Sequence, residues 1–91
     1  MLCTYEVVVR AVCPVDDSND EYNATLESPH QIMCERIVEV VRSFETVKQT
    51  QEQITEAIAI ALGCKVTTVG YHSGVRTTVV VGGRVGKIGA L

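Results

Sequence analysis

Tryptophan is absent from this sequence of 91 residues, and the other aromatic residues are only three tyrosines and one phenylalanine. The hydrophobic core must therefore consist mainly of Val, Ile, Leu and Ala side chains. No apolar run approaches the ~20 residues that a membrane-spanning helix needs. The N-terminus does not resemble a signal peptide, because Glu6 and Arg10 interrupt its apolar positions. We expect a cytoplasmic protein with no membrane partner.

Positive charge is also scarce, and the cysteines do not form close pairs. Eight Lys and Arg residues against eleven Asp and Glu residues give a net charge of -3. This argues against a general phosphate-binding surface, although a few arginines could still contact a nucleic acid specifically. No C-x-x-C pair occurs and the two histidines lie far apart in sequence, so we expect no metal site. The residues concerned are Cys3, Cys13, Cys34, Cys64, His30 and His72.

The length predicts one domain over residues 1–91, and a chain of this size has little room for both a core and a deep pocket of its own. A pocket shared between subunits would solve this problem, so we expect a homo-oligomer with its sites at subunit interfaces. In a cytosolic setting the cysteines stay reduced. Cys3 and Cys64 are expected to behave as small buried hydrophobic residues.

Alternation of apolar and polar residues predicts a first strand over residues 3–13 and a second over roughly 21–28. The polar turn between them carries Cys13 at one end and Asp20 at the other. If the two strands form a hairpin, the thiol and the carboxylate approach each other, and a thiol beside a proton donor can begin covalent catalysis. A turn of this composition can also be only a turn. Asp16 and Asp17 are alternative proton donors.

The middle of the chain predicts two helices. Ser28 followed by Pro29 predicts an N-cap and first turn, with apolar residues at helical spacing from Ile32 and an end near residues 45–47. Thr50 and Gln53 predict a capping box for a second helix, which should stop at Gly63.

The last part of the sequence predicts strands over residues 65–71 and 75–81. A short glycine-containing hairpin joins them, and in it His72 is expected to be an exposed turn residue. Residues 84–91 are expected to be a flexible tail, or to dock on a neighbouring chain. The predicted class is α+β in the order β-β-α-α-β-β, an antiparallel four-stranded sheet with two helices on one face.

With this order of elements, the chain resembles the tunnelling-fold (T-fold) superfamily, and within it the QueF nitrile reductases and their QueF-like relatives. In these families a strand ends in Cys-Pro and an aspartate follows seven residues after the cysteine, as Cys13-Pro14 and Asp20 do here. They also carry a glutamate at the start of the second helix, usually preceded by histidine. Gln51-Glu52 matches this pair with the histidine replaced. The resemblance implies a ring-shaped oligomer.

Two motifs of the reductases are missing. Their Glu-Ser-Lys-Ser stretch, which is associated with nicotinamide binding, corresponds here to Glu35-Arg36-Ile37-Val38. Their Arg-Gly-Gly after the third strand corresponds to Tyr71-His72-Ser73-Gly74-Val75. The chain is therefore more similar to the QueF-like, amidine-forming branch, and no cofactor is expected.

The resemblance implies a substrate, 7-cyano-7-deazaguanine, either free or within a nucleic acid. Cys13 would attack the nitrile carbon to form a thioimide, Asp20 would move the proton, and ammonia or an amide-nitrogen donor would release an amidine. Glu52, with Gln51 beside it, would bind the base, since one carboxylate can accept two neighbouring N–H groups. An acid in a first helical turn needs no ligand, however. The alternatives are an NADPH-dependent nitrile reductase and a non-catalytic purine-binding or assembly module.

Overall fold

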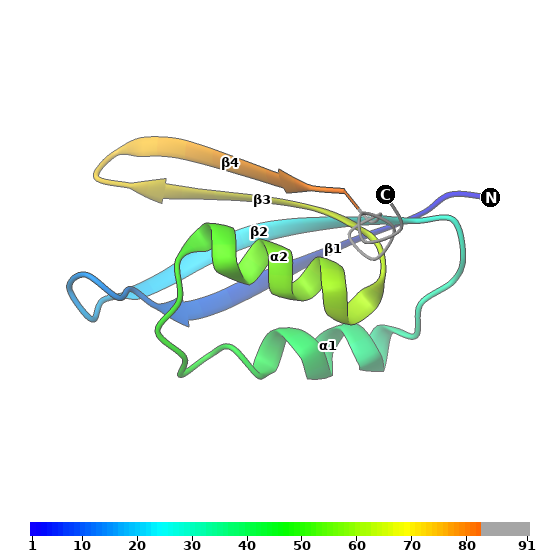
Figure 1. The fold of residues 1–91 in the computed structure, drawn as a ribbon, viewed down its shortest axis with the longest axis horizontal. Coiled ribbons are helices and arrows are strands. Elements are labelled where there is room, and N and C mark those ends of the chain that lie inside the picture. The colour runs from blue at the N-terminus through cyan, green and yellow to red at the C-terminus, as the bar shows by residue number, and fades with distance from the viewer. Residues whose placement is uncertain (83–91) are drawn as a thin grey trace, which may run out of the picture.

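The structure is a computed structural model that describes residues 1–82, and its elements follow the predicted order. The strands are β1 (Cys3–Val12), β2 (Asn19–Ser28), β3 (Lys65–His72) and β4 (Val75–Val81), and the helices are α1 (Cys34–Arg42) and α2 (Gln51–Leu62). The strands form one antiparallel sheet in the order β1-β2-β3-β4. Both helices lie on the same side of this sheet (Figure 1). The predicted β-β-α-α-β-β architecture is confirmed.

The register of β1 and β2 decides which side chains of the first hairpin share a face. Val9 lies opposite Tyr22 and Ala11 lies opposite Asp20. Val9, Ala11 and Tyr22 are buried, so this face is covered by the helices. Because side chains alternate along a strand, Cys13 follows Ala11 on the same face, as a diagonal neighbour of Asp20. β2 begins two residues before the predicted start, which places Asp20 in the strand and not in the turn.

The capping box and the stop of α2 are confirmed. The Thr50 hydroxyl accepts a hydrogen bond from the Gln53 N–H at 3.2 Å, and the Gln53 side-chain oxygen accepts one from the Thr50 N–H at 3.0 Å. At the other end Gly63 has φ 63°, a left-handed conformation that glycine adopts without steric cost. These local signals fix where α2 begins and where it ends.

The predicted start and end of α1 are wrong. Ser28 is not an N-cap, because it is the buried last residue of β2 and pairs with Cys3. The chain bends at Pro29 and His30 and is not helical before Cys34, and the Tyr5 hydroxyl accepts a hydrogen bond from the Ile32 N–H at 2.8 Å. The helix begins only after Met33 and ends at Arg42, beyond which the chain continues as turns to residue 46.

The hairpin between β3 and β4 is tighter than predicted. β3 continues to His72, and only Ser73 and Gly74 form the turn, with φ 53° and 81°. Two residues with positive φ are typical of a type I′ turn, which matches the twist of the strands. His72 is therefore a strand residue and not an exposed turn residue. The tail predicted at residues 84–91 lies outside the described residues.

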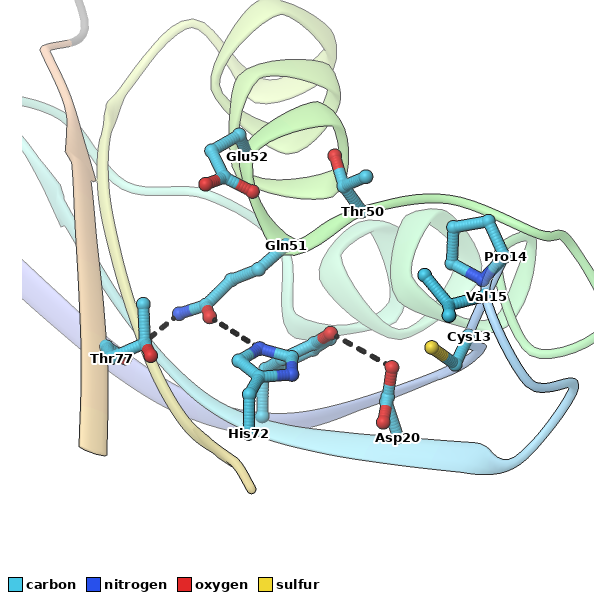
Figure 2. A pocket seen from close by; sticks show the side chains of 10 residues that line it. Cys13, Pro14, Val15, Asp20, Thr50, Gln51, Glu52, His72 and Thr77 are labelled. Atoms are coloured by element: carbon cyan, nitrogen blue, oxygen red, sulfur yellow. Dashed lines mark hydrogen bonds between the residues drawn. The ribbon is translucent and has the colours of Figure 1, made fainter. Parts of the chain in front are cut away.

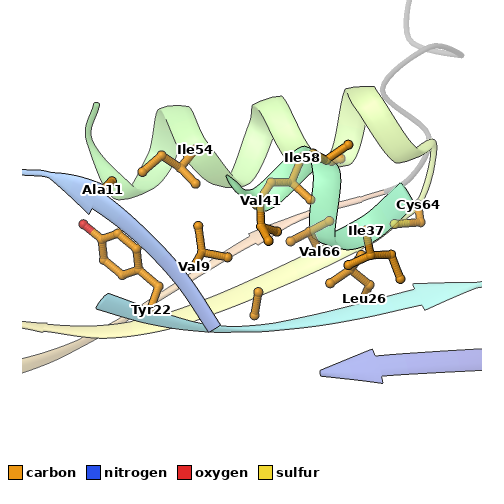
Figure 3. Packing of buried hydrophobic residues seen from close by; sticks show 13 residues of the cluster. Val9, Ala11, Tyr22, Leu26, Ile37, Val41, Ile54, Ile58, Cys64 and Val66 are labelled. Atoms are coloured by element: carbon orange, nitrogen blue, oxygen red, sulfur yellow. The ribbon is translucent and has the colours of Figure 1, made fainter. Parts of the chain in front are cut away.

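The core lies between the sheet and the two helices and consists mainly of aliphatic side chains, as the scarcity of aromatics requires (Figure 3). Cys64 is buried within it, as predicted, whereas Cys3 is only half-buried. Tyr22 is the largest fully buried side chain. Within residues 1–82, no helix is long and apolar enough to cross a membrane.

Two isoleucines of α2 provide a matched test of this packing. Ile58 is 0% exposed and Ile60 is 60% exposed. We expect Ile58→Ala to lower the free energy of unfolding by about 2–5 kcal/mol, because it removes buried methylene groups and leaves a cavity. Ile60→Ala should change it by less than about 0.5 kcal/mol. Urea unfolding of both variants measures the difference, and equal losses would contradict the described orientation of α2.

Candidate active site

A pocket of about 210 Å³ lies where the β1–β2 hairpin, the start of α2 and the end of the β3–β4 hairpin meet. It brings together all four residues that the sequence singles out, namely Cys13, Asp20, Gln51 and Glu52 (Figure 2). The remaining lining residues are Pro14, Val15, Tyr22, Thr50, His72 and Thr77. One chain therefore places the thiol, the aspartate and the glutamate around the same cavity.

Cys13 is held at the edge of the sheet by backbone hydrogen bonds. Its N–H donates to the Ser18 carbonyl at 2.8 Å, and its own carbonyl accepts from the Asp17 N–H at 3.0 Å. Its side chain is half-buried, and Figure 2 shows the sulfur directed towards the side of the pocket where Asp20 lies. The thiol is thus fixed in position and still open to the cavity.

The segment before α2 is joined to β1 at the residue that precedes Cys13. The Val12 N–H donates to the Val47 carbonyl at 3.2 Å, and the Gln49 N–H donates to the Val12 carbonyl at 3.3 Å. This short parallel bridge places the first turn of α2, with Thr50 and Glu52, beside Cys13. Thr50 and Glu52 are far from Cys13 in sequence, so only the fold brings them close to it.

The two alternative aspartates lie in the turn and already have partners. Asp16 accepts hydrogen bonds from the Ser18 hydroxyl at 2.7 Å and the Ser18 N–H at 3.0 Å, and these bonds, with a smaller contribution from the Cys13 side chain, lower its pKa below the ordinary value. Asp17 has φ 61° and pairs with Lys48 at 2.8 Å. Both are exposed, and neither lines the pocket that contains Glu52.

Asp20 is positioned by a buried tyrosine. The Tyr22 hydroxyl donates a hydrogen bond to Oδ2 of Asp20 at 3.2 Å. Burial first, and then the negative charge of Asp20, raise the pKa of Tyr22 far above its ordinary value, so the hydroxyl keeps its proton and remains a donor. Gly70 makes room for the ring, because a Cβ there would collide with the Tyr22 side chain.

Glu52 and Gln51 have opposite surroundings although they are adjacent. Glu52 is exposed in the first turn of α2, at the edge of the pocket, where the positive end of the helix dipole favours a carboxylate. Gln51 is 2% exposed. Its Nε2 donates to the Thr68 carbonyl at 3.1 Å and the Thr77 carbonyl at 3.0 Å, and its Oε1 lies 3.0 Å from Nε2 of His72. The Gln51 side chain therefore has its hydrogen bonds within the protein.

His72 and Tyr22 are two pocket residues whose positions the sequence reasoning missed. The alternation of β3 over Val66, Thr68, Gly70 and His72 is the signal that could have placed His72 on the helix-covered face. Its ring packs against Tyr22 with the ring centroids 5.8 Å apart. No three His, Cys, Asp or Glu side chains within residues 1–82 lie so that they could hold a metal ion.

No family model matches the sequence, and no curated protein matches it. The structure, however, is similar to the crystal structure of the archaeosine synthase QueF-like in its apo form. The TM-score is 0.76 at 22% sequence identity, and the similarity covers 88% of this chain and 90% of that chain. This similarity shows the fold, and it confirms the predicted T-fold.

The raised pKa of Tyr22 predicts a pH dependence of stability. The folded chain holds this proton more tightly than the unfolded chain, so the resulting stabilisation is complete below about pH 10 and is lost as the pH rises towards the raised pKa. As the pH is raised from about 9 to about 11, the free energy of unfolding of Tyr22→Phe should therefore fall by less than that of the wild type. Urea unfolding at several pH values measures this loss.

Tyr71→Phe is the matched control, because Tyr71 is 67% exposed. This variant should follow the wild type across the same range of pH. A Tyr22→Phe variant whose stability falls in parallel with the wild type would show that the Tyr22 hydroxyl does not titrate differently in the folded chain.

Proposed function

We propose that this protein is a QueF-like enzyme that acts on 7-cyano-7-deazaguanine, free or within a nucleic acid, and converts its nitrile into an amidine. The observation that carries the proposal is the shared pocket of Cys13, Asp20 and Glu52. The similarity in fold to an archaeosine synthase supports it. A ring-shaped homo-oligomer in the cytoplasm, with sites at subunit interfaces, belongs to the same proposal.

The first step is addition of the thiol to the nitrile. The Sγ atom of Cys13 forms a bond to the nitrile carbon, one π bond of the C≡N group breaks, and the thiol proton moves to the nitrile nitrogen. The product is a thioimide that retains all atoms of both reactants. A thiol becomes a strong nucleophile only when it loses its proton, so this step needs a proton acceptor beside Cys13.

Asp20 is suited to carry that proton. Its Oδ2 is held by the Tyr22 hydroxyl, which fixes the direction of the carboxylate towards the pocket. A fixed carboxylate can take the proton from sulfur and give it to the nitrile nitrogen as the S–C bond forms. Tyr22 keeps its own proton because of its raised pKa. It therefore orients Asp20 without competing as an acid.

In the second step a nitrogen nucleophile replaces the sulfur. Ammonia, or an amide-nitrogen donor that supplies it, adds to the thioimide carbon, and the C–S bond breaks. The amidine leaves and Cys13 regains its thiol. The reductases' Glu-Ser-Lys-Ser and Arg-Gly-Gly motifs, the first of which is associated with nicotinamide binding, are missing from this chain. Their absence favours amidine formation over the alternative nitrile reduction.

Glu52 would bind the base. A guanine-like edge presents two neighbouring N–H groups, and an exposed carboxylate at the helix start can accept both. Such a pair of charge-assisted bonds would fix the nitrile at a defined distance from Cys13. Gln51, expected from the sequence to share this role, has its side chain committed to Thr68, Thr77 and His72.

The covalent step is tested by incubating the chain with 7-cyano-7-deazaguanine and measuring its intact mass. We expect an increase equal to the full mass of the nitrile, because addition loses no atom. Cys13→Ala should show no increase. Cys34→Ala is the matched control, since Cys34 is exposed in α1, and it should form the adduct like the wild type.

The products distinguish the alternatives. Amidine released after addition of ammonia supports the proposal, whereas an amine released after addition of NADPH would replace it with nitrile reduction. A tight non-covalent complex, with no mass increase in the wild type, would instead indicate a binding module.

The proton role is tested by the rate of adduct formation. Asp20→Asn should slow it by on the order of 100-fold, since positioned acid–base groups contribute roughly 10²–10⁴-fold to such steps. Glu21→Gln, at an exposed neighbour in the same strand, should leave the rate unchanged. A larger loss in Asp16→Asn than in Asp20→Asn would give the proton role to Asp16.

A further inference from the structure

The orientation of the Gln51 amide is determined by its partners. Its nitrogen faces the backbone carbonyls of Thr68 and Thr77, at 3.1 and 3.0 Å. Carbonyl oxygens can only accept hydrogen bonds, so the group that faces them must be the NH₂. The opposite orientation would place the Gln51 side-chain oxygen against both backbone carbonyl oxygens in a buried place, and unsatisfied buried acceptors are unfavourable. The Gln51 oxygen therefore faces His72.

This orientation fixes the tautomer of His72. The Gln51 oxygen is an acceptor and lies 3.0 Å from Nε2 of the imidazole, so Nε2 must carry a hydrogen. In the neutral ring the other nitrogen, Nδ1, then has a free lone pair and accepts hydrogen bonds. Figure 2 shows this second nitrogen on the side of the ring towards Asp20. Among the hydrogen bonds of residues 1–82, none involves Nδ1.

The amide and phenol donors of the pocket are hydrogen-bonded within the protein, whereas several of its acceptors are not. The Gln51 NH₂ donates to the strands, and the Tyr22 hydroxyl donates to Asp20. Three kinds of acceptor remain around the cavity: the free oxygen of Asp20, the carboxylate of Glu52 and Nδ1 of His72. A ligand that complements this set must present several N–H groups.

We propose that His72 is a base-binding residue, whose Nδ1 accepts a hydrogen bond from an N–H of the bound heterocycle that Glu52 does not take. Gln51 is then a positioning residue that holds the imidazole in the accepting tautomer. The identity of the heterocycle rests on the proposed function, whereas the tautomer of the neutral imidazole rests on its hydrogen-bond geometry. His72 would add to the selection of guanine-like bases over bases with fewer N–H groups.

Two substitutions of His72 separate a ligand contact from a structural role. His72→Gln keeps an amide near the position of Nε2, and so keeps the bond to Gln51, but it has no acceptor at the position of Nδ1. His72→Asn keeps an acceptor near Nδ1 and loses the bond to Gln51. Dissociation constants for guanine and for 7-cyano-7-deazaguanine, measured by calorimetry in a Cys13→Ala background, report binding without the covalent step.

We expect His72→Gln to weaken binding by about tenfold or more, the loss of one hydrogen bond to a buried ligand group. His72→Asn should weaken it by only a few-fold. The reverse order would show that His72 serves only the bond to Gln51, and would overturn the proposal. Nitrogen chemical shifts of the wild-type imidazole give a test without a ligand: hydrogen on Nε2 supports the proposal, and hydrogen on Nδ1 overturns it.

The same measurements keep this proposal distinct from the proposed function. If the wild type forms the nitrile adduct but His72→Gln binds as tightly as its parent, the role of His72 is wrong and the enzymatic function stands. If guanine binding depends on His72 but no adduct forms on Cys13, the function is wrong and the role of His72 stands. A Cys13→Ala chain that binds neither ligand, together with a wild type that forms no adduct, overturns both.

Discussion

The buried amide of Gln51 is the contact on which the geometry of the pocket depends. It is the first residue of α2, and its side chain reaches across to β3 and β4 through hydrogen bonds to Thr68 and Thr77. A polar group that is 2% exposed is costly unless all its bonds are made, so the amide tolerates few arrangements of the three elements. The helix start, and Glu52 with it, is thereby held over the sheet.

A second constraint acts on the opposite side of the cavity. Tyr22 is buried against Gly70, and its hydroxyl orients Asp20. The backbone of Val12 joins the hairpin that carries Cys13 to the segment before α2. The pocket residues therefore come from four elements and two connecting segments, held by contacts that do not involve a ligand. Such preorganisation lets a ligand bind without rearranging the fold.

The polarity of the site depends on its two carboxylates and on which donors are hydrogen-bonded within the protein. Asp20 and Glu52 provide negative charge, and the donors of Gln51 and Tyr22 are satisfied within the protein. What faces the cavity is a set of acceptors beside a thiol. This combination suits a neutral, N–H-rich heterocycle with an electrophilic carbon, and it links the proposed binding mode to the proposed chemistry through the same residues.

The sequence by itself determined the order of elements, because the alternation of β1, the capping box at Thr50 and the stop at Gly63 are local signals that need no distant partner. It also identified Cys13, Asp20 and Glu52 as candidate site residues. The false helix start at Ser28-Pro29 arose because strand pairing with Cys3 outweighed a local capping signal. Only the tertiary structure placed His72 in the pocket and turned Gln51 inwards, because both depend on hydrogen bonds between residues 17 to 26 positions apart.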